Sequence, residues 1–144
     1  MTGQPLDQLH AKTRRYAEAH LAEDEAVVAV IVGRSKQAMV VTDRQLVIVK
    51  AGMLAGAGFG ARCAAFPLDA IRTINVHAGP GLAALEVVTA SEADAGKADL
   101  RAAYQRPNWL PCEPSIGASP RIAHLRAFVE SDGRARSARA ELSA

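Results

Sequence analysis

Two apolar runs on either side of a short polar turn form the most regular pattern in the chain. The runs are residues 39–41 and 46–49, and the turn is 42–45. Residues that branch at the β-carbon favour extended backbone, and two such runs around a polar turn are typical of an antiparallel hairpin. The sequence therefore predicts a hairpin over 39–50, with the neighbouring runs as further strands of the same sheet.

The segments around this hairpin predict the rest of the sheet. Residues 26–32 are apolar almost throughout, which predicts a strand buried on both faces. A glycine-rich connection at 51–61 follows the hairpin. Beyond it, short runs of apolar and polar residues predict four more strands. These strands are expected at 62–68, 71–77, 82–89 and 97–104.

Two other segments carry apolar residues at steps of three and four, the pattern of an amphipathic helix. The first is 5–21, which we expect to pack on its own domain; a partner or a membrane surface is the alternative. The second begins at Ser119 and Pro120, a capping residue followed by a proline suited to the first turn. Gly133 is expected to end it.

Prolines interrupt the chain between the last predicted strand and the second helix. Residues 105–118 contain Pro107, Pro111 and Pro114. Because proline lacks a backbone N–H, a regular helix or a central strand is not expected here. The sequence predicts an ordered loop or a partner-binding segment instead.

A chain of 144 residues, 49% of them hydrophobic, can form one domain with its own core. We expect a single domain over 1–131 and a mobile tail over 132–144. The expected parts of the domain are an N-terminal helix at 1–22, a barrel at 23–104, a Pro/Trp loop at 105–118 and a capping helix at 119–131.

Charge and composition narrow the class of protein. The formal net charge of +2 is too small for a dedicated nucleic-acid binder. The first residues lack the apolar centre of a signal peptide, and 51–61 is too short to span a bilayer. A soluble cytoplasmic protein is expected. Cys63 and Cys112 are expected as reduced thiols, with one disulfide as the alternative in an exported protein.

The hairpin and the chain after it resemble the bacterial pleckstrin-homology-like (PH-like) domains of the YokE-like group. The resemblance covers 23–104, and its motifs are the Thr-Asp-Arg turn at 42–44 and the Pro-Leu-Asp-x-Ile corner at 67–71. It implies a mainly β fold, a seven-stranded bent antiparallel barrel capped by a C-terminal helix, here with an extra N-terminal helix. The family has no shared catalytic site, so the resemblance implies no active-site residues.

The residues themselves show no catalytic constellation. Residues 56–61 match the GxGxxA pattern of a dinucleotide-binding loop, but the sequence predicts no helix after them. The histidines have no second ligand at metal-binding spacing. Asp43 and Asp69 are expected to cap turns. We therefore expect no enzyme, no cofactor and no metal.

A basic turn is the candidate site for an anion or a lipid head group. Arg34 and Lys36 lie between the first two predicted strands, and Arg44 lies in the hairpin turn. Arginine and lysine pair directly with phosphate. In PH domains that bind phosphoinositides, basic residues of the first loop hold phosphates. Solvated turn charges are the alternative.

Two apolar segments are candidates for partner contact. Met53, Leu54 and Phe59 form the apolar tip of the glycine-rich connection. Trp109 and Leu110 lie between prolines, where a tryptophan either packs as a lid over the core or anchors an interface. The expected function is a non-catalytic binding or assembly module that acts through protein–protein contacts or self-association. The alternative is a peripheral membrane module that binds anionic lipid through Arg34, Lys36 and the 51–61 loop.

Overall fold

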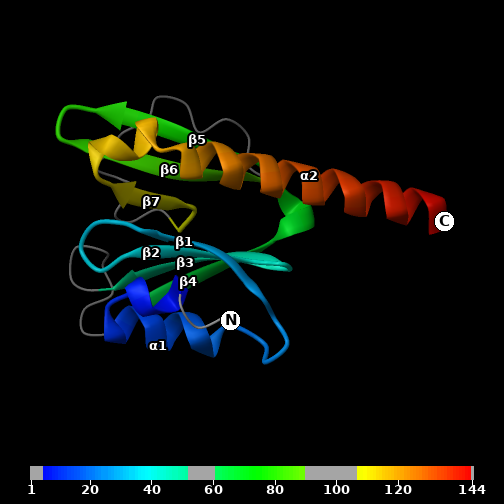
Figure 1. The fold of residues 1–144 in the computed structure, drawn as a ribbon, viewed down its shortest axis with the longest axis horizontal. Helices are drawn as coiled ribbons and strands as arrows, with labels where there is room; N and C mark the ends of the chain where they lie inside the picture. The colour runs from blue at the N-terminus through cyan, green and yellow to red at the C-terminus, as the bar shows by residue number, and fades with distance from the viewer. Residues whose placement is uncertain (1–4, 52–60, 90–106, 144) are drawn as a thin grey trace.

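The computed structural model describes residues 5–51, 61–89 and 107–143, and within them the protein is mainly β (Figure 1). The described strands form two antiparallel sheets, and the 3₁₀ turn η3 (Leu68–Ala70) leads from one to the other. The first sheet has the order β1 (Val27–Val32), β2 (Ala38–Thr42), β3 (Gln45–Ala51), β4 (Ala61–Pro67). The second has the order β5 (Ile71–Gly79), β6 (Leu82–Thr89), β7 (Trp109–Cys112).

The predicted hairpin is confirmed as β2 and β3, whose register runs from Val41 opposite Leu46 to Ala38 opposite Val49. Its turn is stabilised by Thr42, whose hydroxyl oxygen accepts the backbone N–H groups of Arg44 at 3.1 Å and Gln45 at 3.0 Å. Ser and Thr hydroxyls commonly stabilise turns in this way.

Asp43, which was expected to cap a turn, accepts the backbone N–H of Ala26 through Oδ1 at 3.1 Å. The backbone N–H of Asp43 donates in return to the Ala26 carbonyl at 3.0 Å. Asp43 therefore ties the hairpin turn to the start of β1.

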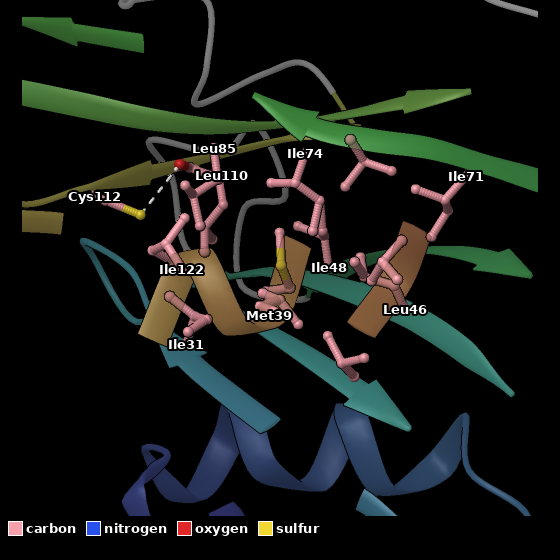
Figure 2. Packing of buried hydrophobic residues seen from close by; sticks show 14 of the residues in the cluster. Ile31, Met39, Leu46, Ile48, Ile71, Ile74, Leu85, Leu110, Cys112 and Ile122 are labelled. Carbon is pink, nitrogen blue, oxygen red and sulfur yellow. Dashed lines mark hydrogen bonds between the residues drawn. The ribbon is translucent and has the colours of Figure 1, made fainter. Parts of the chain in front are cut away.

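The two faces of the first sheet are covered by different partners. One face packs on the second sheet and on the helix α2 (Pro120–Ser143). Leu46 and Ile48 point into this main core, as Figure 2 shows. Val47 and Val49, which alternate with them, pack in a smaller cluster with residues of the N-terminal segment. This alternation follows from the two-residue period of a strand.

The predicted N-terminal helix is present in two pieces, the 3₁₀ turn η1 (Pro5–Gln8) and the helix α1 (Ala11–Ala19). His10 caps α1, and its Nδ1 accepts the Lys12 N–H at 3.3 Å. Leu6, Leu9 and Ala17 are buried against the first sheet. The expectation that this segment packs on its own domain is confirmed.

The prediction that 26–32 is buried on both faces is wrong. Val28 is 45% exposed and Val32 is 50% exposed. The physical reason is the position of β1 at the edge of its sheet, where fewer neighbours cover it. The adjacent strand β2 is the one that is buried at every residue.

The prediction that 105–118 is a loop is also wrong in part, because β7 lies within it and the 3₁₀ turn η5 (Pro114–Ala118) follows. Pro111 fits this strand because, among the described strands, β7 pairs with β6 alone, and an edge strand tolerates a proline that faces outward. The strand expected at 97–104 lies outside the described residues.

Two expectations about the barrel and its helix need correction. The described strands form two sheets that are not closed into one barrel. The helix α2 does not end at Gly133 but continues to Ser143, and it projects beyond the sheets in Figure 1. Gly133 therefore costs helix propensity without ending the helix.

Candidate functional site

A groove of about 330 Å³ lies between the edge strand β1 and the first turns of α2. A volume of this size is at the lower end of the range for ligand-binding clefts. Residues from β1, α2 and the N-terminal turn η1 line it. They are Gln8, Val28, Ala29, Val30, Arg121, His124, Leu125 and Phe128.

The strand side of the groove presents backbone groups. Among the described strands, β1 pairs with β2 alone, so its other edge faces the groove. The Gly33 N–H donates to the Gln37 carbonyl at 2.8 Å. Alternate residues of an antiparallel pair bond the same neighbour, so the backbone groups of Ile31 also face β2, and those of Val30 point away from it, toward the groove. Beyond Val32 the same edge meets β7, because the Arg34 N–H donates to the Pro111 carbonyl at 2.9 Å.

Two features blunt this edge. The register of β1 shifts between Val27 and Ala29, which marks a bulge beside Val28. The Arg121 side chain donates from Nη1 to the Val30 carbonyl at 3.4 Å, a long and therefore weak hydrogen bond. Both are devices that natural sheets use to protect an exposed edge.

The helix side of the groove follows from the apolar pattern of α2. Ile122, Leu125 and Val129 are buried in the main core. Phe128 is half-buried and packs beside them, while His124 is exposed. Residues three and four apart share a helix face, so the rim of the buried stripe borders β1.

Hydrogen bonds fix α2 in this position. The Ser119 hydroxyl accepts the Arg121 N–H at 3.3 Å, which confirms the predicted helix start. Arg126 donates from Nε to the Ile74 carbonyl at 2.8 Å, and the Thr73 hydroxyl donates to Glu130 at 2.8 Å. These hydrogen bonds to β5 fix the position of α2, which forms the helix side of the groove.

The charge of the groove has one sign. Arg121 and His124 are the ionisable residues among its lining residues, and neither can carry a negative charge. Both are exposed. Within the described residues, Arg121 donates to a backbone carbonyl and has no carboxylate partner. The groove therefore combines apolar walls, a strand edge and an un-neutralised guanidinium.

The structure does not bring the three predicted cations together. Arg34 lies at one end of β2, where it forms a bidentate pair with Glu113, both bonds 3.1 Å long. This guanidinium lowers the pKa of Glu113 below its usual value. Lys36 lies beside Arg34 in the same turn, with a positive φ of 64°.

Arg44 lies at the opposite end of β2 and pairs with Asp24, with 2.6 Å between Nη2 and Oδ2. The hydrogen bond and the charge of Arg44 lower the pKa of Asp24. Two of the three predicted anion contacts are thus already paired with carboxylates, at opposite ends of a strand.

Two of the residues predicted to contact a partner are buried in the structure. Trp109 is 1% exposed and Leu110 is fully buried, so neither presents a surface to a partner in this structure. Trp109 stacks on the His77 ring with centroids 4.6 Å apart, and Leu110 is part of the main core. Met53, Leu54 and Phe59 lie outside the described residues.

A second, smaller cleft of about 140 Å³ lies beside Lys50, opposite Arg62 on β4. Burial, together with the charge of Arg62, lowers the pKa of Lys50 to about 7. Burial likewise raises the pKa of the Cys112 thiol to about 12, and Cys63 and Cys112 are both free. Among the described residues, no three metal-binding side chains gather at one point.

The fold and the groove define a mainly β protein with two antiparallel sheets, a C-terminal helix and a cleft between that helix and a sheet edge. Among the described helices, none is long and apolar enough to cross a membrane. No family model matches the sequence, and no curated protein matches it. A similar solved structure is a DUF1696 family protein with a pleckstrin-homology domain from Shewanella loihica. It is 13% identical, with a TM-score of 0.48, over 83% of this chain and 88% of that one.

Proposed function

We propose that this protein is a non-catalytic binding module of PH-like architecture that acts through protein–protein contacts or self-association. The observation that supports it is the groove between β1 and α2. Its strand side includes Val28, a large hydrophobic side chain that stays 45% exposed. An apolar groove beside a free strand edge suits an added strand of polypeptide.

A photo-crosslinking amino acid placed at Val28, which lines the groove and is 45% exposed, tests this proposal. Lys12, on the far side of the first sheet in α1, is the matched control position. We expect a crosslinked product from Val28, either a dimer at twice the 15.2 kDa chain mass or a complex with a second protein, and none from Lys12. Equal products from both positions, or none from Val28, would overturn the proposal.

The alternative is a peripheral membrane module that binds anionic lipid through Arg34 and Lys36. It is less favoured because Arg34 would have to leave Glu113, at the cost of a bidentate ion pair. Flotation with anionic vesicles at low and physiological salt tests it. Salt-sensitive flotation that Arg34→Glu abolishes would favour the membrane over the protein partner.

A further inference from the structure

We infer that the occupant of the β1–α2 groove is an extended peptide segment of another protein, with alternating apolar side chains and one carboxylate that pairs with Arg121. This inference rests on the proposed function and makes it more specific. It names the chemistry of the partner and the residue that selects it.

The backbone of β1 can form hydrogen bonds with an extended peptide. The Val30 carbonyl points away from β2, and within the described residues the hydrogen bond that it accepts is the long one from Arg121 Nη1, at 3.4 Å. A backbone N–H of an added strand can make this bond with better geometry, at roughly 2.9 Å. The incoming strand would therefore replace Arg121 at the carbonyl without leaving the carbonyl unpaired.

That exchange releases the Arg121 guanidinium beside the bound peptide. Arginine binds a carboxylate through two parallel N–H···O bonds, which are stronger than a bond to a neutral carbonyl. His124, one turn of helix on, adds a second donor or cation at the same rim. No acidic side chain is among the described residues that line the groove. A carboxylate on the peptide would thus meet complementary charge and no repulsion.

The apolar residues that line the groove favour apolar side chains at the other positions of the peptide. In an extended chain alternate residues share a face, so those on the inner face would lie against Leu125 and Phe128. Val28, at 45% exposed, would gain cover from the same residues. Apolar residues on either side of the acidic position are therefore expected.

A second copy of this chain fits the groove less well. The free edge that a copy would offer is β1 itself, whose sequence is Val-Val-Ala-Val-Ile-Val. It has no carboxylate to receive Arg121. Charge complementarity therefore favours an acidic segment from a different protein.

Selection from a phage library of random heptapeptides tests this inference, with the full chain immobilised. Arg121→Glu is the test variant. Arg72→Glu, at an exposed position on β5 away from the groove, is the matched control. We expect the native protein and the control to select peptides with apolar residues around one fixed Asp or Glu. We expect Arg121→Glu to lose these peptides or to select basic ones.

The best peptide is then measured by fluorescence anisotropy, next to its Glu→Gln or Asp→Asn form. Loss of the charged pair should weaken binding about tenfold or more. Selected peptides without an acidic position, or peptides that bind Arg121→Glu equally well, would overturn the inference and leave the groove as a binding site. No selection at all would also overturn it. In that case a dimer crosslinked from Val28 would still support the proposed function, while the absence of any crosslink would remove both.

Discussion

The Thr42 hydroxyl donates a 2.5 Å hydrogen bond to Oε2 of Glu25, a carboxylate that is only 8% exposed. Gln45 donates to the same oxygen at 2.9 Å, and the Ala22 N–H donates to Oε1 at 3.0 Å. Three donors thus hold one buried charge between the segment after α1 and the β2–β3 turn. The turn motif that resembles PH-like domains therefore has a structural role here.

We expect Glu25→Gln to lower the free energy of unfolding at pH 7 by about 1.5–3 kcal/mol, the usual worth of hydrogen bonds to a charged group. Burial alone would raise the pKa of Glu25, but the bonds from Thr42, Ala22 and Gln45 outweigh it and lower the pKa below 4.5. The unfolded chain therefore binds this proton more tightly. The carboxylate stabilises the fold above pH 4.5, and this contribution is lost as pH falls through the folded pKa.

Urea unfolding of the native protein and Glu25→Gln between pH 3 and pH 7 measures this difference. Glu23→Gln, at an exposed neighbouring position, is the control. A stability gap between native protein and Glu25→Gln that stayed constant down to pH 3 would contradict the prediction.

We expect Gln37→Met to stabilise the protein. Gln37 is fully buried, and in the described structure neither Nε2 nor Oε1 has a hydrogen-bond partner. A buried polar group without a partner costs about 1–3 kcal/mol, and methionine has a similar shape without that cost. Thermal unfolding should show a higher midpoint for Gln37→Met than for the native chain. A lower midpoint would mean that the amide is satisfied in solution, for instance by an internal water.

We expect Lys50→Met to be more stable than the native protein at pH 7, by at least about 1 kcal/mol, since one pKa unit corresponds to about 1.4 kcal/mol. Burial and the charge of Arg62 lower the pKa of Lys50 from 10.5 to about 7. Between these values the unfolded chain binds a proton that the folded chain does not, so native stability should rise with pH across this window.

The Lys50→Met variant should lack this rise between pH 7 and pH 10. Lys36→Met, at an exposed position, should keep it. Chemical denaturation at several pH values compares the three proteins. A Lys50→Met variant that is less stable at pH 7 would show that the fold depends on the ammonium group.

We expect Gly33→Ala to destabilise the protein by about 1–3 kcal/mol, the usual cost of overpacking. A Cβ atom at Gly33 would lie 2.6 Å from the Pro111 carbonyl oxygen and 2.8 Å from Cδ1 of Leu110. It would also disturb the bond from the Arg34 N–H to that carbonyl, at 2.9 Å. Gly117→Ala is the control, because its Cβ would meet Val76 at an ordinary 3.7 Å. Equal midpoints in urea for the two variants would contradict this prediction.

The strands that the sequence predicts well are those with local signals. The β2–β3 hairpin has two β-branched runs and a Thr-Asp-Arg turn, and its register depends on residues close together in the chain. β7 is different, because Pro111 argues against a strand unless the position at a sheet edge is known. That position is set by pairing with β6, about 25 residues earlier, and no local pattern encodes it.

The candidate site was harder to predict than the fold. Arg34 and Arg44 looked available because their carboxylate partners, Glu113 and Asp24, come together with them only in the folded chain. Arg121 and His124 border the apolar stripe of a predicted helix, but their importance depends on which strand edge that helix meets. The exposure of Val28 depends on the position of β1 at the edge of its sheet, which the apolar run at 26–32 does not encode.

The smaller cluster of buried residues, between the N-terminal segment and the first sheet, has a consequence for the order in which the chain can fold. All of its fully buried members lie between Leu6 and Val49. A growing chain therefore holds this layer of helix and three strands complete before the second sheet has been synthesised. The main core, by contrast, needs residues as late as Val129. One face of the first sheet can thus be sealed early, while the other face, lined by Met39, Leu46 and Ile48, must wait for the last third of the chain.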